Sequence, residues 1–167
     1  MPDVLGDVLL QVLVGPPGAG KTRFAQSAYP AEWIVAADDI RERLTRWRRE
    51  NPVASWKSAA PARERVSRAI AREIRRRLQA QLPTVYDNTN LLKSNRESLL
   101  RLVPPSVRVK YLVFDRPLRE KLATRGWRPA RLIEQQHALF QAELPDILAG
   151  DGREFVTVED RRILGEA

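Results

Sequence analysis

The chain has 167 residues, 43% of them hydrophobic, and its 29 Lys and Arg outnumber its 21 Asp and Glu, for a formal net charge of +8. This hydrophobic content excludes an intrinsically disordered chain, and the absence of cysteine excludes a disulfide framework and thiolate metal sites. The single histidine, His137, argues against a structural zinc site.

Short apolar runs alternate with helical patterns along the sequence. In chain order we expect strand 8–14, helix 21–28, strand 33–36, helix 39–49, a loop at 51–61, helix 62–81, strand 84–86, helix 94–102, strand 107–114, helices 117–124 and 129–143, and strand 155–158. Such alternation indicates a parallel sheet covered by helices on both faces. The predicted fold class is therefore α/β, with three layers (α/β/α) around a parallel sheet of about five strands.

The length is that of a single domain spanning 1–167. No segment approaches the ~20 apolar residues that cross a bilayer. Asp3 and Asp7 stand where a signal peptide would need Lys or Arg. We expect one cytoplasmic domain with no membrane partner.

The segment from Gly15 to Thr22 reads GPPGAGKT and matches G-x-x-x-x-G-K-[ST] at each fixed position, between a predicted strand and a predicted helix. Glycines let backbone amides curl around phosphate oxygens, and the start of the following helix adds partial positive charge. Lys21 is expected to reach the β- and γ-phosphates of ATP, and the Thr22 hydroxyl to bind Mg²⁺. The predicted nucleotide-binding residues of this loop are Gly15, Pro17, Gly18, Ala19, Gly20, Lys21 and Thr22.

What the sequence lacks narrows the class of P-loop protein. It contains no Asn-Lys-x-Asp for guanine recognition and no ABC-type signature, and it is too short for a motor ATPase with a helical lid domain. Small kinases, which pass the γ-phosphate to an acceptor, remain. Asp38 and Arg41 follow the second predicted strand, where they could accept a hydroxyl proton and hold an acceptor phosphate. The alternative is that Asp38 only caps a helix and Arg41 is a surface residue.

Taken together, these motifs resemble the P-loop polynucleotide 5′-kinase family over about residues 8–145. The motifs that follow the phosphate loop are Asp38-Asp39-x-Arg41, Asp87-Asn88-Thr89-Asn90, a strand ending in Phe114-Asp115, and Arg125-Gly126. The resemblance implies that Asp38 is the general base for a 5′-hydroxyl and that Arg41 contacts the acceptor's phosphate. It also implies that Asp87 and Asn90 organise the acceptor site.

The resemblance further implies a helical lid at about 117–131, in which two basic residues four positions apart grip the donor phosphates. The matching positions are Lys121 and Arg125, and Lys121 departs from the family because it lacks the arginine fork. The catalytic residues implied are Lys21, Asp38, Arg41 and Arg125.

The expected function is ATP- and Mg²⁺-dependent transfer of the γ-phosphate to a 5′-hydroxyl end of DNA or RNA, with nucleic-acid repair enzymes such as a ligase or phosphatase as partners. Two alternatives remain open: a kinase of the same fold acting on a sugar, nucleotide sugar or antibiotic, and an ATP-gated nucleic-acid-binding module without transfer. The net charge of +8 favours a polyanionic acceptor.

Other residues have two interpretations each. Trp47, Trp56 and Trp127 are either stacking platforms for a base or packing residues, and His137 is assigned no role. Trp33 is predicted to lie in the core.

The arginines of the predicted helix 62–81 form either a solvated face or a track for a nucleic-acid backbone. In the solvated face, Glu64 would pair with Arg68 and Glu73 with Arg77.

Overall fold

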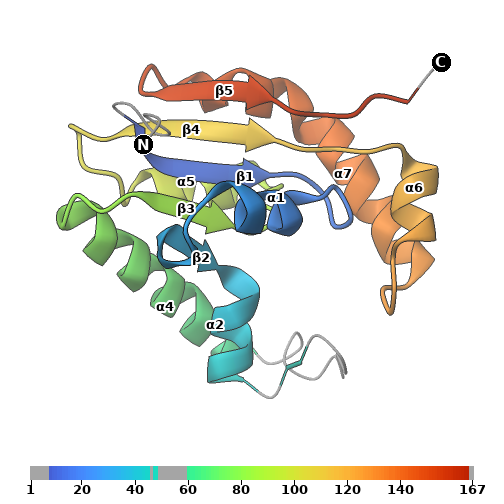
Figure 1. Ribbon diagram of the computed structural model, residues 1–167, viewed down its shortest axis with the longest axis horizontal. Helices are drawn as coiled ribbons and strands as arrows, with labels where there is room; N and C mark the ends of the chain where they lie inside the picture. The colour runs from blue at the N-terminus through green and yellow to red at the C-terminus, as the bar shows by residue number, and fades with distance from the viewer. Residues whose placement is uncertain (1–7, 46, 49–59, 166–167) are drawn as a thin grey trace.

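The computed structural model describes residues 8–45, 47–48 and 60–165. Five strands pair in parallel in the order β2-β3-β1-β4-β5, which puts β1 at the centre of the sheet (Figure 1). The strands are β1 (Val8–Val14), β2 (Ile34–Ala36), β3 (Thr84–Asp87), β4 (Arg108–Val113) and β5 (Val156–Asp160). The predicted α/β class and parallel five-stranded sheet are confirmed.

Helices occupy most of the connections between strands. They are α1 (Lys21–Ala28), α2 (Ala37–Leu44), α4 (Ala60–Gln79), α5 (Lys93–Leu100), α6 (Leu118–Ala123) and α7 (Ala130–Leu148), with 3₁₀ turns at Ala31–Trp33 and Gly150–Gly152. Figure 1 shows α1 in front of the sheet and α5 behind it. No helix of the described residues is both long enough and apolar enough to cross a membrane.

The two faces of the sheet bury separate apolar clusters. The larger cluster joins alternate residues of β1, including Val12, to the apolar stripe of α4 and to residues of α5 and α7. The smaller cluster lies on the α1 face around Leu13 and Ala25, with Trp33 packed against it as predicted. Because β1 is buried on both faces, its sequence is a continuous apolar run interrupted only by the buried Gln11.

The register of the sheet aligns the carboxyl ends of its inner strands. Leu13, next to the end of β1, lies opposite Asp87 of β3 on one side and Leu112 of β4 on the other. The loops that follow these strands therefore meet at one edge of the sheet, and this edge carries the site described below.

The helix after β2 differs from its predicted range. It begins at Ala37 and ends at Leu44, so Asp38 lies in its first turn and does not cap it. The helix stops where it does because Thr45 has extended backbone angles and its hydroxyl donates to the Arg41 carbonyl oxygen over 2.6 Å. The predicted loop at 51–61 and Trp56 lie almost wholly outside the described residues.

The arginines of α4 are mostly exposed. The predicted ion pairs are present, Arg68 to Glu64 at 3.9 Å and Arg77 to Glu73 at 3.8 Å. Arg77 itself is buried, however, and donates to the Thr84 hydroxyl and the Pro83 carbonyl oxygen at the start of β3. Arg77 therefore anchors the start of β3 to α4 and is not part of the solvated face.

Candidate active site

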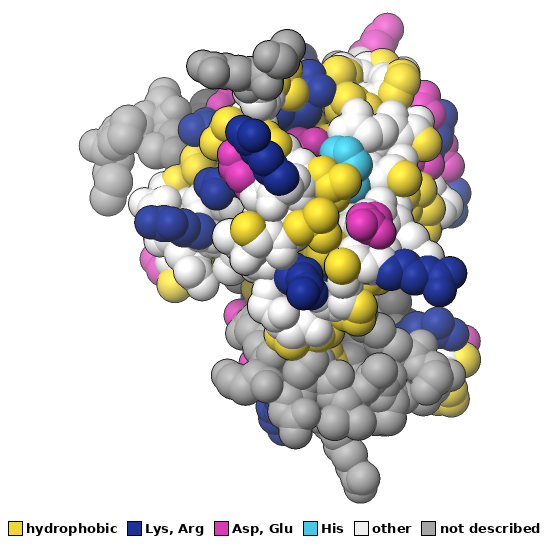
Figure 2. Space-filling view, turned by 90° about the vertical axis from the view of Figure 1, so that its right-hand side faces the viewer, with side chains coloured by type: hydrophobic (Ala, Val, Ile, Leu, Met, Phe, Trp, Pro, Cys, Tyr) yellow, Lys and Arg dark blue, Asp and Glu magenta, His cyan; other side chains and the backbone are white. Residues whose placement is uncertain are grey.

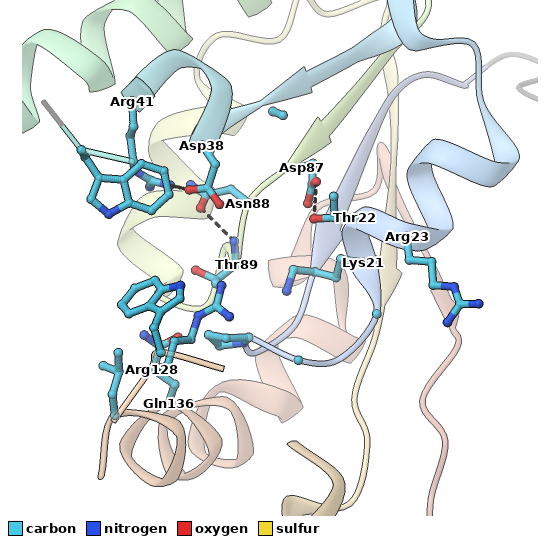
Figure 3. A pocket seen from close by; sticks show the side chains of 17 residues that line it. Lys21, Thr22, Arg23, Asp38, Arg41, Asp87, Asn88, Thr89, Arg128 and Gln136 are labelled. Atoms are coloured by element: carbon cyan, nitrogen blue, oxygen red, sulfur yellow. Dashed lines mark hydrogen bonds and ion pairs between the residues drawn. The ribbon is translucent and has the colours of Figure 1, made fainter. Parts of the chain in front are cut away.

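A cavity of about 360 Å³ lies at the carboxyl edge of the sheet. Its walls come from the phosphate loop and start of α1, the start of α2, the turn after β3, and the segment joining α6 to α7 (Figure 3). The functional side chains that line it are Lys21, Thr22, Arg23, Asp38, Arg41, Trp47, Asp87, Asn88, Thr89, Trp127, Arg128 and Gln136. With four basic side chains against two carboxylates, the lining suits an anionic ligand.

The phosphate loop, residues 15–20, is held in a shape that needs glycine. Gly18 and Gly20 have φ angles of 80° and 93°, which side chains with a Cβ rarely adopt. The amide of Gly15 donates to the Thr89 carbonyl oxygen over 3.0 Å, which ties the loop to the turn after β3. Helix α1 starts at Lys21 without an acidic residue in its first turn, so its positive N-terminus faces the loop uncompensated.

Lys21 extends from the loop into the cavity (Figure 3). Its Nζ donates to the Pro16 carbonyl oxygen over 2.9 Å, and the side chain is buried. Burial lowers the pKa of Lys21 to about 8, with the nearby Asp87 charge opposing this shift. An anionic phosphate would restore the charged form, so the loop is built for an anion at this point.

Thr22 and Asp87 meet across 65 residues of sequence. The Thr22 hydroxyl donates to Asp87 Oδ2 over 2.7 Å. Burial raises the pKa of Asp87, while the Thr22 hydrogen bond and the Lys21 charge lower it. A hydroxyl beside a carboxylate matches the oxygen ligands of Mg²⁺, which usually takes the rest of its shell from water and phosphates. Among the described residues, no cluster of three acidic, histidine or cysteine side chains could hold a metal alone.

Asp38 and Arg41 lie on the opposite wall from Lys21 (Figure 3). Their spacing on α2 brings Arg41 Nη1 to 2.5 Å from Asp38 Oδ1, as the sequence predicts. Both side chains keep exposed surface toward the cavity, 37% for Asp38 and 21% for Arg41. The pair therefore offers a carboxylate and a guanidinium to one ligand.

The buried Asn90 holds the turn after β3 in place. Asn90 adopts a φ of 50° and its amide donates to the Leu13 carbonyl oxygen over 2.8 Å. Asn90 is buried and does not line the cavity, whereas Asn88 and Thr89 do. Of the two residues predicted to organise the acceptor site, Asp87 thus faces the cavity and Asn90 shapes the turn.

A buried arginine supports the same turn. Arg96 of α5 has no exposed surface and donates to the carbonyl oxygens of Asn90 and Leu91. Its other donors reach Asp151 over 2.8 and 2.9 Å and Glu143 over 3.1 Å. Nothing in the local sequence around Arg96 predicts this role, because its partners lie up to 55 residues away.

The lid residues do not lie where the family pattern predicts. Lys121 of α6 is fully buried, and its Nζ contacts Asp115 and His137 instead of the cavity. Arg125 is exposed in the turn after α6 and does not line the cavity either. The basic side chain that this segment contributes is Arg128, next to Trp127.

Sequence reasoning missed Arg128 and Gln136. The only signal for Arg128 was a basic residue beside a tryptophan just before a predicted helix, and Gln136 carries no signal. Trp47 and Trp127, two of the three tryptophans considered as stacking platforms, both line the cavity.

A second hollow of about 530 Å³ adjoins the far side of the phosphate loop and shares Gly20 and Arg23 with the first. Arg116, after β4, and residues 159–163, at and just beyond the end of β5, form part of its walls. A phosphate chain on the loop would thus have room on either side, toward the Asp38 wall or toward Arg116.

The surface around this edge of the molecule is mixed. Figure 2 shows this face, over which basic, acidic and hydrophobic side chains are interspersed. Trp127 is one of the large hydrophobic residues exposed among the described residues.

Solved structures with this fold include a chain of an RNA repair complex and two kinases named for small molecules. A chain of the Pnkp1/Rnl/Hen1 RNA repair complex aligns with a TM-score of 0.67 and 21% identity, over 82% of this chain and 45% of the other. A gluconokinase from Sinorhizobium meliloti 1021 aligns at 0.53 and 18%, over 90% and 81% of the two chains. Shikimate kinase from Acinetobacter baumannii, in complex with shikimate, aligns at 0.55 and 16%, over 96% and 85%.

These likenesses establish a kinase-like P-loop fold. This chain spans less than half of the matching chain from the repair complex. No curated protein sequence matches it. Residues 10–145, however, match the sequence family described as an AAA domain, which covers the phosphate loop, both cavity walls and most of α7. The chain therefore belongs to this AAA domain family of P-loop kinases.

Proposed function

We propose that the protein is a phosphotransferase that moves the γ-phosphate of ATP to a 5′-hydroxyl end of DNA or RNA. The observation that carries this proposal is the Asp38–Arg41 pair, held at 2.5 Å on the wall facing Lys21 and Thr22. One side of the cavity thus suits a phosphate donor, and the other suits a hydroxyl acceptor that has a phosphate nearby.

The donor side neutralises charge. Backbone amides of the phosphate loop, the N-terminus of α1 and the Lys21 ammonium would surround the β- and γ-phosphates. Thr22 and Asp87 would hold Mg²⁺, which lowers the repulsion between the phosphates and the incoming hydroxyl. Arg128 is the basic side chain of the lid segment best placed to add charge, and the family role of Arg125 would require this segment to move.

The acceptor side moves a proton. In the proposed step, the 5′-hydroxyl oxygen forms a bond to the γ-phosphorus while the bond from that phosphorus to the β,γ-bridging oxygen breaks. The hydroxyl proton passes to the Asp38 carboxylate, and ADP leaves with the negative charge of the broken bond. Arg41, which forms an ion pair with Asp38, would orient this carboxylate and bind the first phosphate of the acceptor strand.

A nucleic-acid acceptor agrees with the positive charge of the chain and of its cavity lining. The chain carries a net +8, and the cavity lining has four basic side chains against two carboxylates. A polyanion would be attracted to such a surface, and its binding would weaken steeply as salt rises. By the likeness to a chain of an RNA repair complex, we further propose that enzymes acting on the same ends, such as a ligase or phosphatase, are its partners.

A small-molecule acceptor is the second candidate. The gluconokinase and the shikimate kinase match this chain over more than four fifths of both lengths, which the repair-complex chain does not. A neutral sugar would have little need for Arg41 beside Asp38, whereas a carboxylate such as gluconate or shikimate could bind to Arg41. The binding of any such small molecule would depend on salt far less than that of a polynucleotide.

The deciding experiment measures transfer of label from γ-labelled ATP, with Mg²⁺, to a short 5′-hydroxyl oligonucleotide. The matched control is the same oligonucleotide carrying a 5′-phosphate. Labelling of the hydroxyl end alone is expected. Labelling of gluconate or shikimate without labelling of the oligonucleotide would favour the second candidate. ATP binding without any labelling would favour a binding module that transfers no phosphate.

A further inference from the structure

The solvent-facing side of α4 carries a row of arginines. The helix has 20 residues, among them seven arginines and two glutamates, and its buried side includes Val66, Ile70 and Ile74. At 3.6 residues per turn, most of the arginines project within an arc of roughly 100° on the side opposite these buried residues. We call this row the arginine stripe, and its members are all exposed: Arg65, Arg68, Arg72, Arg75 and Arg76.

Few carboxylates neutralise the arginine stripe. Arg68 lies 3.9 Å from Glu64, and Arg76 lies 2.8 Å from Glu73. Among the described residues, no carboxylate lies within ion-pair distance of the other three members, Arg65, Arg72 and Arg75. Arginines three or four positions apart on one helix face repel each other, so the row works against the stability of α4. The fold therefore does not account for the stripe, and its charges are available to an anionic ligand.

The arginine stripe adjoins the wall of the cavity that would receive the acceptor. Helix α4 packs against α2, which carries Arg41 on that wall (Figure 1). The exposed Arg43 of α2 lies close enough to α4 to act on Glu73. The hydrogen bond from Arg76 is the main cause that lowers the pKa of Glu73, and the charge of Arg43 contributes. Basic side chains thus extend from the cavity over α2 to the stripe.

The dimensions of the stripe suit the phosphate backbone of a nucleic acid. At a rise of 1.5 Å per residue it spans roughly 16 Å, the length of about five phosphates along one strand. The arginine fork binds phosphate oxygens in bidentate fashion. A membrane surface fits less well, because interfacial helices bury an apolar face in the lipid, and the apolar face of α4 is packed in the core.

We propose that the arginine stripe of α4 binds phosphates of the acceptor strand downstream of the end that is phosphorylated. This inference rests on the proposed function and deepens it, because it names the preferred acceptor as a strand long enough to reach from the cavity across α2 to α4. Contacts to phosphates add affinity without selecting a sequence. No arginine of the stripe lines the cavity, so the stripe acts on binding of the strand and not on the chemical step.

The test removes three charges from the stripe and, as a control, three from another surface. The stripe variant is Arg65→Gln/Arg72→Gln/Arg75→Gln, in which glutamine keeps a helix propensity similar to that of arginine. Its melting temperature should not fall, because the change relieves repulsion between neighbouring arginines.

The control variant removes the same charge next to β4 and β5, which lie on the other side of β1 from β2 and β3. It is Arg101→Gln/Arg108→Gln/Arg153→Gln, at three exposed positions. Because both variants have the same net charge, a difference between them reports the place of the charges and not their number.

Transfer is measured on 5′-hydroxyl oligonucleotides of about 4 and about 16 nucleotides, since only the longer one could reach over the stripe. In the stripe variant, the KM of the longer acceptor should rise roughly 10- to 100-fold at about 0.1 M salt. Its kcat and the KM of the shorter acceptor should change little. The dependence of log KM on log salt should weaken by about 2, which is ~0.7 for each lost phosphate contact. The control variant should behave as wild type.

An equal rise in KM for both lengths, or equal effects of the stripe and control variants, would overturn the proposal. Fluorescence anisotropy with the longer oligonucleotide, already 5′-phosphorylated, tests the stripe without any transfer, and the same loss of affinity is expected there. Wild-type affinity of the stripe variant in this assay would also overturn the proposal. Transfer to neither length by the wild type would contradict the proposed function, and the anisotropy result would still decide whether the stripe binds the strand.

Discussion

The ammonium group of Lys121 lies 2.5 Å from Asp115 Oδ1, and the Lys121 side chain has no exposed surface. The same group contacts His137 Nδ1 at 2.7 Å, so it links α6 to the end of β4 and to α7. The phosphate loop rests on its stem, because a Cβ placed on Gly18 would lie 3.5 Å from Lys121 Cγ. In this arrangement Lys121 supports the loop from beneath.

We expect Lys121→Met to destabilise the fold by about 3 kcal/mol, because it leaves the buried Asp115 carboxylate without its charged partner. The melting temperature should fall by roughly 6–12 °C for a chain of this size. Arg119→Met is the matched control on the same helix, where the side chain is exposed. An unchanged melting temperature combined with a large loss of ATP affinity would instead indicate that Lys121 reaches the donor phosphates.

Lys21 gives the nucleotide-free protein a distinctive alkaline stability profile. Because burial lowers the pKa of Lys21 from 10.5 to about 8, the folded state binds fewer protons than the unfolded state between these values. The free energy of unfolding should therefore rise with pH across this window, by about 3 kcal/mol. Urea titrations at several pH values would measure this rise.

Lys21→Met is the reference for that profile, since it removes the titrating group; it should lack the rise and should also abolish phosphate transfer. Bound phosphates would restore the charge on Lys21, so ATP binding at about pH 8.5 should take up a proton. Calorimetry in two buffers of different ionisation enthalpy would detect it. A profile identical in wild type and variant would contradict the burial of Lys21 as the cause.

Asp38→Asn should lower kcat by about 10²- to 10⁴-fold while the KM for ATP changes little, because the amide cannot accept the hydroxyl proton. Steady-state kinetics with a 5′-hydroxyl oligonucleotide would measure both parameters. Asp39→Asn provides the comparison, since Asp39 is the next residue on α2, exposed and outside the cavity lining. Loss of ATP affinity in Asp38→Asn, with kcat preserved, would place Asp38 near the metal and exclude it as the base.

His137 should make the fold sensitive to acid. Burial and the neighbouring Lys121 charge lower the pKa of His137, so the folded state resists its protonation more than the unfolded state does. Its contribution to stability is therefore lost as pH falls below about 6.5. His137→Gln retains an oxygen acceptor for Lys121 without a titrating ring. Between about pH 7 and pH 5 its melting temperature should fall less than that of wild type, and equal losses would contradict this role.

The sequence specified those parts of the structure that depend on near neighbours. The strand at 8–14 and the helix at 21–28 were predicted to the residue, because an uninterrupted apolar run and a glycine-rich loop leave few alternatives. The helix after β2 was predicted to end five residues too late, because its end depends on a hydrogen bond from Thr45 that no periodicity reveals.

The same division holds for the site. Lys21 and Thr22 follow the glycine loop, Asp87 ends β3, and Asp38 lies two residues after β2. Their convergence at one edge of a parallel sheet could therefore be anticipated. Arg128 and Gln136 enter the cavity only because of how α6 and α7 fold back over it. That placement depends on buried contacts such as Lys121 with Asp115, which connect distant segments and leave no local pattern.

The close packing around Gly15 determines where the phosphate loop lies. A Cβ at this position would lie 2.3 Å from the Phe114 carbonyl oxygen, so the phosphate loop and the end of β4 touch backbone to backbone. The Gly15 amide is at the same time bonded to Thr89 on the other side. The phosphate loop is therefore held on both flanks, and any side chain at position 15 would push it away from the end of β4.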